Sequence, residues 1–239
     1  MKGIILAGGL GTRLHPLTRA VNKHLLAVWD KPMIYYPIQT LVKAGIADIM
    51  VVIGGPHAGG FLHVLQNGKE FGIDHLEYAY QENEGGIAAA LSLCEDFADG
   101  GSLTVILGDN TTDADISEDV KNFSDGALIF LKKVPDPQRF GVPVFGANDE
   151  ILEIQEKPKK PASEYAVTGL YIYDNSVFEK IGKVKPSARG ELEITDVNNL
   201  YLKAGKLQWA ELKGYWSDAG TFETLFLANK YWASKAGIK

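Results

Sequence analysis

The clearest chemical signature lies near the N-terminus, where an apolar run leads into Gly8-Gly9-Leu10-Gly11-Thr12-Arg13. Glycine lets the backbone approach a ligand closely and adopt positive φ angles, so that successive N–H groups can converge on phosphate oxygens. The segment is not a dinucleotide fingerprint, because Leu14 stands where the third glycine belongs, and it is not a P-loop, which ends in Gly-Lys-Ser/Thr. This glycine-rich loop predicts a phosphate site, with an ordinary tight turn as the alternative.

Two cationic side chains close to the loop favour the phosphate site over the turn. Arg13 ends the loop, and Lys23 follows before the apolar pair Leu25-Leu26. A triphosphate needs such charges to stabilise its leaving group during transfer. Taken alone, Lys23 is more typical of a solvated surface lysine.

Two aspartates are candidates for a magnesium site. Asp109 follows the apolar run Leu103–Leu107, and Asp218 lies just before the last helix-like segment. Ligands of open α/β sheets bind beyond the carboxyl ends of the strands, so we expect Asp109 to project into the site. Mg²⁺ takes oxygen ligands, commonly one or two carboxylates together with substrate phosphates. The alternatives are ordinary turn chemistry for Asp109 and a turn or helix cap for Asp218.

A third candidate group is Glu156-Lys157-Pro158, at the end of another strand-like run. It places an acceptor for sugar hydroxyls beside a cation for a phosphate. The alternative is a surface ion pair at a strand end.

These groups need a scaffold, and the first half of the chain predicts one by alternating strand-like and helix-like segments. Such alternation favours a largely parallel sheet covered by helices on both faces. The expected strands, rich in Ile, Val, Leu and Tyr, are Lys2–Ala7, Ile49–Ile53, Leu76–Tyr80 and Leu103–Leu107. The expected helices are Met33–Ala44, Gly60–Gln66 and Ile87–Phe97.

The second half of the chain mixes its signals. Its expected strands are Ala127–Val134, Val142–Phe145, Ile151–Glu156 and Val167–Tyr173, and its expected helices are Glu191–Ala204 and Phe222–Ser234. No repeat, low-complexity tract or long Gly/Ser linker divides the sequence. We therefore expect one domain over residues 1–239, with a parallel nucleotide-binding half of about residues 1–125 and a mixed half, about 126–239, that closes over it.

The composition excludes several classes of protein. The chain is 46% hydrophobic, enough for a sizeable core, and its formal net charge of −6 argues against a nucleic-acid partner. Cys94 is the only cysteine, which rules out an internal disulfide, and its helix-like surroundings predict a small buried side chain. The short, glycine-terminated apolar run at the N-terminus does not fit a signal peptide, and no apolar stretch approaches the length of a membrane span. We expect a cytoplasmic protein with no membrane partner.

In their order along the chain, these motifs resemble the glucose-1-phosphate thymidylyltransferase family, from Lys2 to about Ala233. Three segments look like this subfamily rather than nucleotidyltransferases at large: Lys31-Pro32-Met33-Ile34-Tyr35-Tyr36-Pro37, Ala166-Val167-Thr168-Gly169-Leu170-Tyr171 and Arg189-Gly190-Glu191-Leu192-Glu193-Ile194-Thr195-Asp196. Because the chain ends soon after Trp232, we expect a short form without the C-terminal helices that help form a regulatory nucleotide site in longer relatives.

The resemblance implies a Rossmann-like nucleotide-diphospho-sugar transferase fold, with a mixed, mostly parallel sheet flanked by helices. It implies an enzyme of dTDP-sugar biosynthesis that makes dTDP-glucose and pyrophosphate from dTTP and glucose 1-phosphate, with Mg²⁺ as its cofactor. It also implies a homo-oligomer. The half of about residues 126–239 would then bind the sugar.

The same resemblance implies the site residues. We expect the nucleotide to contact Leu6, Gly8, Gly9, Gly11, Thr12, Arg13, Lys23, Gln81, Gly86 and Asp109. We expect the sugar phosphate to contact Asn110, Gly141, Glu156, Lys157, Val167, Tyr171 and Arg189. Mg²⁺ would lie on Asp109 and Asp218, and the catalytic set would be Arg13, Lys23, Asp109, Lys157 and Asp218. Gln81 and Gly86 would read the thymine base.

The expected chemistry needs no general base, in agreement with a sequence whose histidines pair with no recognisable nucleophile. A sugar 1-phosphate has a second pKa of about 6, so it is mostly dianionic at neutral pH. Its oxygen can attack the α-phosphorus directly, with pyrophosphate leaving in line. Two alternatives stay open: the same transfer from UTP, and a non-catalytic sugar-nucleotide sensor. Arg13, Lys23, Asp109 and Asp218 together argue against the sensor.

Overall fold

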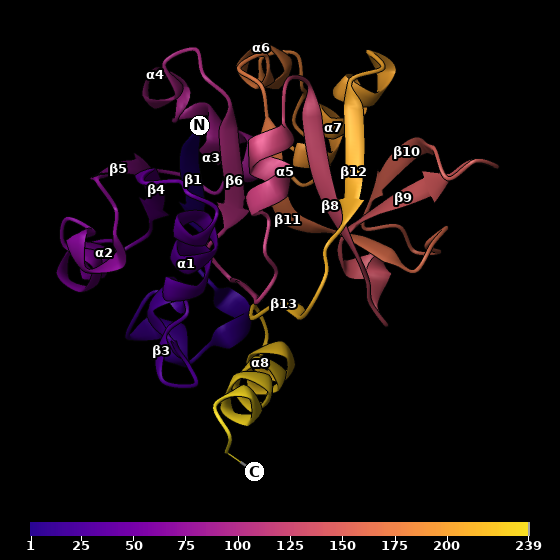
Figure 1. Cartoon of the computed structure of the whole chain (residues 1–239). Helices are drawn as coiled ribbons and strands as arrows, with labels where there is room; N and C mark the ends of the chain where they lie inside the picture. Colours follow the sequence, from indigo (N-terminus) through magenta and orange to yellow (C-terminus); the bar gives the residue numbers. More distant parts are fainter. Residues whose placement is uncertain (239) are drawn as a thin grey trace.

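The computed structural model describes residues 1–238, and a seven-stranded sheet forms its centre (Figure 1). The strands of this sheet are β1 (Lys2–Ala7), β4 (Asp48–Gly54), β5 (His75–Gln81), β6 (Leu103–Leu107), β8 (Ala127–Lys133), β11 (Tyr165–Tyr173) and β12 (Leu207–Glu211). Their order is β12-β8-β11-β6-β1-β4-β5. β11 runs antiparallel to β6 and β8, and every other neighbouring pair is parallel.

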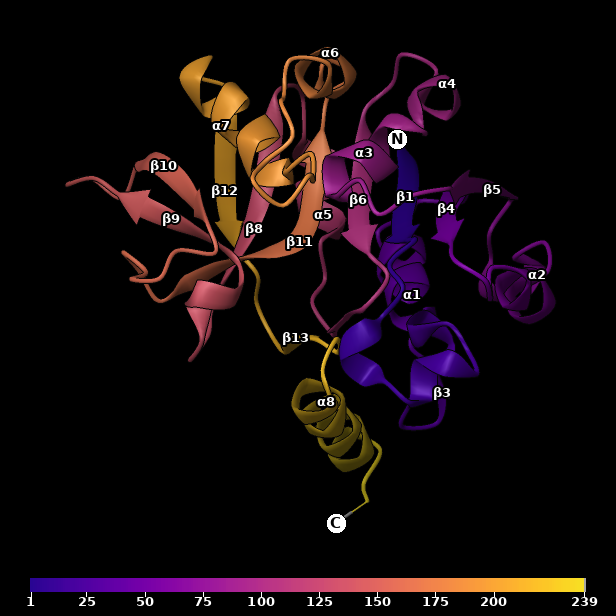
Figure 2. The same cartoon turned by 180° about the vertical axis from the view of Figure 1, so that it is seen from behind.

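The core lies in two layers because alternate strand residues point to opposite faces of the sheet. In β1, Ile4 and Leu6 pack into one apolar cluster, and Ile5 and Ala7 pack into the other. The helices are α1 (Tyr35–Lys43), α2 (Gly59–Leu65), α3 (Ile87–Ser92), α4 (Glu95–Ala98), α5 (Ser117–Asn122), α6 (Val177–Ile181), α7 (Ile194–Lys203) and α8 (Phe222–Lys235). Helices α3, α6 and α7 cover one face, while α1 and α2 cover the other (Figures 1 and 2).

This arrangement confirms the predicted mostly parallel α/β sheet with helices on both faces. Strands from both halves of the chain share the one sheet. No helix among residues 1–238 is long and apolar enough to cross a membrane.

Two predicted helices differ from the observed ones at points where tertiary contacts override local propensity. The segment Ile87–Phe97 divides into α3 and α4 around Cys94, which is fully buried as expected. The segment Glu191–Ala204 becomes helical only at Ile194. Its first residues stay out of the helix, and the Leu192 amide donates to the Gly85 carbonyl at 2.8 Å while the Leu192 carbonyl accepts from Ala88 at 3.2 Å.

Several short elements carry no clear sequence signal. Among them are α5, α6 and β12, and the short strands β2 (Ala27–Val28), β3 (Lys31–Pro32), β7 (Asn110–Thr112) and β13 (Trp216–Asp218). The hairpin of β9 (Gly141–Phe145) and β10 (Ile151–Glu156) agrees with the predicted strands and lies beside the main sheet (Figure 1).

A bulge interrupts β11 where it pairs with β8. The partner register jumps between Val167 and Tyr171, and Gly169 adopts a φ of +80°. A side chain at Gly169 would place its Cβ 2.7 Å from Leu107, so the bulge requires glycine.

The C-terminal helix α8 extends away from the sheet and is fixed at both of its ends (Figures 1 and 2). A capping box between Thr221 and Thr224 begins it. Near its other end, Asp113 accepts hydrogen bonds from Tyr231 and from Lys235, the latter at 2.6 Å. Asp113 also accepts from the Tyr215 amide at 2.7 Å, which ties α8 to the strand pair β7–β13.

Candidate active site

A cleft of about 630 Å³ opens at the carboxyl ends of the parallel strands β1, β5 and β6 and at the start of the antiparallel strand β11. This is the edge where ligands bind in open α/β sheets. All of the site residues predicted from the sequence line this one cleft: Leu6, Gly8, Gly9, Gly11, Thr12, Arg13, Lys23, Gln81, Gly86, Asp109, Asn110, Gly141, Glu156, Lys157, Val167, Tyr171, Arg189 and Asp218. The fold thus gathers residues that span almost the whole sequence.

The glycine-rich loop follows β1 and lies against the end of β5. Gly8 packs directly on the Gln81 carboxamide, and a Cβ at Gly8 would overlap its Oε1. Gly11 adopts a left-handed conformation with a φ of +68°, and its carbonyl accepts a hydrogen bond from the Thr18 hydroxyl at 2.9 Å. The loop is therefore held by its backbone and leaves the Arg13 side chain exposed at the cleft.

Gly86 forms the opposite lip of this part of the cleft. Its φ of +93° is one that side chains rarely adopt, and an added Cβ would lie 2.6 Å from the Leu192 carbonyl oxygen. Glycine at this position lets the loop before α3 approach the segment before α7.

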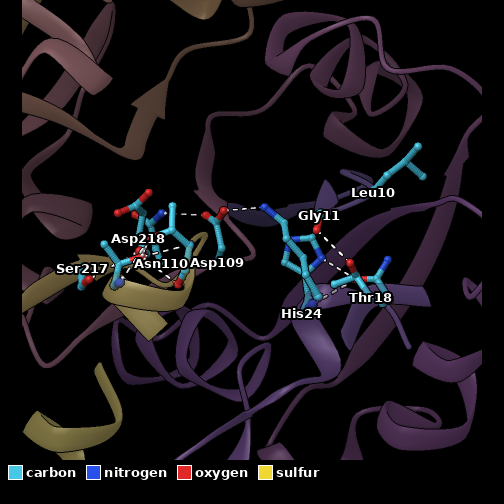
Figure 3. Close-up of polar contacts among 12 residues, drawn as sticks. Leu10, Gly11, Thr18, His24, Asp109, Asn110, Ser217 and Asp218 are labelled. Atoms are coloured by element: carbon cyan, nitrogen blue, oxygen red, sulfur yellow. Dashed lines mark hydrogen bonds and ion pairs between the residues drawn. The ribbon is translucent and has the colours of Figure 1, made fainter. Parts of the chain in front are cut away.

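The two candidate metal ligands meet because the short strands β7 and β13 pair antiparallel. Asp218 lies opposite Asn110 in this register, and the Ala219 amide donates to the Asp109 carbonyl at 2.8 Å. Figure 3 shows Asp109, Asn110 and Asp218 together, across from His24 and Gly11. A Cβ at Gly220 would lie 3.5 Å from Oδ2 of each aspartate, so both carboxylates border one small space.

Each of these carboxylates has a cationic partner. Lys23 Nζ lies 2.6 Å from Asp109 Oδ2, and Arg139 Nη2 lies 2.6 Å from Asp218 Oδ2. Burial alone would raise the pKa of Asp109, but the charge and hydrogen bond of Lys23, together with smaller contributions from His24 and the Asn110 hydrogen bond, outweigh burial and hold the pKa well below its usual range. Burial, and then repulsion from Asp109, raise the pKa of Asp218 to about 6.

Both ends of the Asn110 carboxamide are engaged, one with β13 and the other with Asp109. Its Oδ1 accepts from the Trp216 indole at 2.8 Å, and its Nδ2 donates to Asp109 Oδ1 at 3.3 Å. The side chain is 2% exposed. Its contacts therefore orient Asp109 and Trp216.

On the other side of the cleft, side chains hold one another in place. Glu156 accepts a hydrogen bond from the Thr195 hydroxyl at 2.6 Å and forms an ion pair with Arg189 at 3.1 Å. Arg189 also contacts both carboxylate oxygens of Glu193 at 2.9 Å. Lys157 has a φ of +44°, a strained conformation for a lysine of the kind that collects at functional sites.

Gly141, Val167 and Tyr171 complete this side. Gly141 leaves a gap in which a Cβ would lie 3.1 Å from the Thr195 hydroxyl. Val167 and Tyr171 reach the cleft through the bulge in β11, and burial raises the pKa of Tyr171 well above its usual value.

The further cleft residues to which the sequence assigned no role include His24, Arg139, Thr195 and Gly220. Arg139 lies between the expected strands Ala127–Val134 and Val142–Phe145, where no element was expected, and Thr195 lies within a motif that gave it no role of its own. His24 bonds to Asn22 Oδ1 at 2.7 Å, and burial together with Lys23 lowers its pKa to about 3. It is therefore neutral at physiological pH and adds no cation.

The cleft combines a glycine-rich backbone loop and two cations with a pair of carboxylates. It also holds side-chain oxygens of the kind that accept hydrogen bonds from sugar hydroxyls. Among residues 1–238, no group of three or more His, Cys, Asp or Glu side chains could hold a metal ion by itself. A metal site here would have to share its ion with a substrate, which is the usual situation for Mg²⁺ in phosphoryl-transfer enzymes.

Comparison with known proteins agrees with this geometry. The sequence model of the nucleotidyl transferase family matches residues 2–235. The glucose-1-phosphate thymidylyltransferase of Neisseria gonorrhoeae is 47% identical over 237 residues, and the match covers 97% of this chain and 82% of that protein. The enzyme of the same name from Mycobacterium tuberculosis is 44% identical over 230 residues, and the match covers 94% of this chain and 80% of that one.

Solved structures show the same likeness. A Bacillus anthracis protein assigned as a glucose-1-phosphate thymidylyltransferase, in complex with sucrose, is 51% identical with a TM-score of 0.91, covering 97% of this chain and 94% of that one. A UDP-glucose pyrophosphorylase complexed with UDP-glucose superposes with a TM-score of 0.85 at 22% identity, covering 98% of each chain, which shows the shared fold. The chain therefore belongs to the nucleotidyl transferase family, as a member of its glucose-1-phosphate thymidylyltransferase branch.

Proposed function

We propose that this enzyme transfers the thymidylyl group of dTTP to glucose 1-phosphate and releases pyrophosphate. The proposal depends mainly on the position of the paired aspartates, which lie between the glycine-rich loop on one side of the cleft and the side that contains Gly141 on the other. Lys23 reaches Asp109 from the side of the glycine-rich loop, and Arg139 reaches Asp218 from the segment that leads into Gly141. The names of relatives at 44–47% identity support the same reaction.

In this proposal the glycine-rich loop holds the triphosphate with its backbone N–H groups, and Arg13 and Lys23 offset the negative charge of the leaving pyrophosphate. Glu156 accepts hydrogen bonds from sugar hydroxyls, while Lys157 and Arg189 hold the sugar phosphate. The sugar phosphate is already dianionic, with a second pKa of about 6, so its oxygen attacks the α-phosphorus without a base. The neutral His24 agrees with this assignment.

The residues present fit a magnesium ion. The space at Gly220 is bordered by carboxylate oxygens of both Asp109 and Asp218, and only a residue without a side chain leaves it open. Two carboxylates with room for substrate oxygens are a donor set that suits Mg²⁺. Asp109 and Asp218 would hold the ion, which when bound would neutralise charge on the reacting phosphates.

The Gln81 side chain supports recognition of a pyrimidine base whose edge carries a hydrogen-bond acceptor next to an N–H donor. Its carboxamide lies against Gly8 at the end of β5 and offers both a donor and an acceptor, which match the O4 and N3–H of thymine or uracil. A wrong base would leave buried polar groups unpaired, whereas thymine and uracil differ by one methyl, worth about 10–200-fold in an apolar pocket. We therefore propose a preference for dTTP, appreciable use of UTP and little use of CTP, ATP or GTP.

The test is a pyrophosphate-release assay with glucose 1-phosphate and each of these five nucleotides, reported as kcat/KM. The proposal predicts the order dTTP, then UTP, then the others, and predicts that Gln81→Ala reduces the preference. Best activity with UTP would assign the enzyme as a uridylyltransferase. Best activity with ATP or GTP would contradict the assignment of Gln81, and no release with any nucleotide would support a non-catalytic sensor.

Homo-oligomer formation belongs to the same proposal. Helix α8 exposes three large apolar side chains, Phe222, Phe226 and Leu227, which are 44%, 65% and 55% exposed. An apolar surface of this kind supports contact with another copy of the chain. Light scattering of the purified protein tests it, and a strictly monomeric mass would contradict it.

A further inference from the structure

The two candidate metal ligands are already neutralised by the chain itself. Besides Lys23 on Asp109, the guanidinium of Arg139 occupies Asp218 Oδ2 at 2.6 Å. The side chains of Arg139 and Asp218 are 25% and 14% exposed, so water and salt screen this pair less than a surface pair. Asp218 Oδ2 is one of the two oxygens that border the space at Gly220. An ion placed there meets an oxygen that Arg139 already holds.

Arg139 is built to keep a position beside Asp218 even without that contact. Its Nη1 lies 2.8 Å from Asp136 Oδ2, and its guanidinium lies 5.0 Å from the centre of the Phe140 ring. Phe140 in turn packs edge-on against Trp216, the first residue of β13, with ring centres 5.4 Å apart. Asp136 and Phe140 can therefore hold the Arg139 side chain in place when its ion pair with Asp218 breaks.

Three cations lie around the space at Gly220. Arg13 Nη2 would lie 3.3 Å from a Cβ at Gly220, Lys23 and Arg139 contact the two aspartates, and Asp136 balances part of the charge of Arg139. These cations offset the attraction of Asp109 and Asp218 for a bare divalent cation. They attract a metal–triphosphate complex, which is an anion.

We propose that Arg139 is an internal substitute for the metal ion: it neutralises Asp218 in the free enzyme, competes with a bare divalent cation for Asp218 Oδ2, and releases that oxygen when the metal arrives with the triphosphate. This inference rests on the proposed function, because it takes Asp109 and Asp218 as the metal ligands. The enzyme then loads its metal with the nucleotide rather than ahead of it.

The proposal makes an unusual prediction for Arg139→Gln. Removing the competing charge should increase the affinity of the free enzyme for a bare divalent cation by about tenfold, because the charge lies within a few ångströms of the site. Arg139→Lys keeps the charge and should keep an affinity close to that of the unmodified protein. If Arg139 served only to hold the loop in shape, its loss would loosen the site and weaken cation binding.

The experiment titrates Mn²⁺ alone into the full chain without nucleotide and follows the electron paramagnetic resonance signal of free Mn²⁺. The variants are Arg139→Gln, Arg139→Lys and Asp218→Asn. Lys206→Gln is the control for a lost positive charge, because Lys206 pairs with Asp125 on the surface, just before the first residue of β12. Expected are tighter binding for Arg139→Gln, weaker binding for Asp218→Asn and no change for Lys206→Gln.

If Arg139→Gln binds Mn²⁺ no more tightly than the unmodified protein does, while Asp218→Asn still binds it more weakly, the result overturns the inference but not the proposed metal site. Mn²⁺ binding that Asp218→Asn does not weaken overturns both the metal site and the inference.

If Arg139→Gln does not fold, the ¹⁵Nε resonance of Arg139, assigned by its loss in Arg139→Lys, gives a second measurement on the unmodified protein. Saturating Mg²⁺ together with a non-hydrolysable triphosphate should shift it, whereas an unchanged resonance overturns the inference.

Discussion

The two sides of the cleft are built by different means. The proposed nucleotide side, formed by Gly8–Arg13, Lys23, Gln81 and Gly86, is shaped by backbone: Gly11 and Gly86 have φ values of +68° and +93°. The proposed sugar side is formed by Gly141, Glu156, Lys157, Val167, Tyr171 and Arg189, and its centre is shaped by side chains, because Thr195 and Arg189 both contact the Glu156 carboxylate.

This difference matches the two ligands that the sides are proposed to bind. A backbone cradle offers N–H donors to phosphates, which every nucleotide carries, and leaves recognition of the base to one side chain, Gln81. An interlocked set of side chains offers fixed acceptors, which can distinguish one arrangement of hydroxyls from another. The comparison predicts that substitutions act through backbone shape on the nucleotide side and through side-chain orientation on the sugar side.

The largest effect should come from the aspartates where the two sides meet. Asp109→Ala or Asp218→Ala should lower kcat/KM for pyrophosphate release by about 10²–10³-fold or more, because either change removes a proposed metal ligand and the carboxylate that Lys23 or Arg139 contacts in the cleft. EDTA should have the same effect on the unmodified enzyme. Circular dichroism should show an intact fold. Full activity in EDTA would contradict a metal-dependent mechanism.

A smaller effect should follow from Thr195→Val on the sugar side. The change keeps the shape but removes the hydroxyl that donates to Glu156 at 2.6 Å, so the carboxylate loses its fixed orientation. We expect KM for glucose 1-phosphate to rise about tenfold, the value of one hydrogen bond to a charged group, with little change in KM for dTTP. Thr195→Ser should restore both constants. An equal rise in both KM values would show that the two sides are not separate.

Two glycines of the nucleotide side should give a smaller, contrasting effect. Gly8→Ala meets only the end of the flexible Gln81 side chain, so it should raise KM for dTTP by about threefold to tenfold through the displaced carboxamide and leave stability unchanged. Gly86→Ala meets the Leu192 carbonyl at 2.6 Å in a positive-φ conformation, so it should destabilise the fold by about 1–3 kcal/mol. Urea unfolding and initial rates separate the two. Equal loss of stability in both variants would rule out this contrast.

The smallest effect on activity should come from Asp113→Ala, which lies outside the cleft. This change removes the contacts of Asp113 with Tyr231, Lys235 and the Tyr215 amide, and it should lower the free energy of unfolding by about 2 kcal/mol. Activity measured well below the unfolding temperature should stay close to that of the unmodified enzyme. The control is Asp125→Ala, which removes an exposed ion pair with Lys206 and should change little. Equal stability of both variants would show that α8 is not anchored through Asp113.

The sequence predicted most of the sheet because its strands carry their own signal. The runs Lys2–Ala7 and Leu103–Leu107 have the bounds expected for them. Buried strands need continuous apolar side chains, and that need is visible locally. The helix that was expected over Glu191–Ala204 begins late because contacts with Gly85 and Ala88 hold its first residues, and these contacts join parts of the chain far apart in sequence.

The candidate site divides in the same way. Glycines and charged residues beside strand ends could be found in the sequence, and the fold places them in one cleft. The pairing of β7 with β13, which brings Asp218 to Asp109, could not be found because each strand has only three residues. Arg139 and Thr195 act through contacts with Asp218 and Glu156, and no local pattern shows a contact that the fold alone creates.

The most direct test of the central claim follows the oxygen atoms of the sugar phosphate. Glucose 1-phosphate labelled with ¹⁸O in its non-bridging positions is incubated with dTTP, Mg²⁺ and the enzyme, and the products are examined by ³¹P NMR. Direct attack on the α-phosphorus predicts dTDP-glucose with ¹⁸O in the bridge between its two phosphorus atoms, and pyrophosphate without label. Label in pyrophosphate, or no labelled dTDP-glucose, would contradict the proposal that this cleft joins the two substrates.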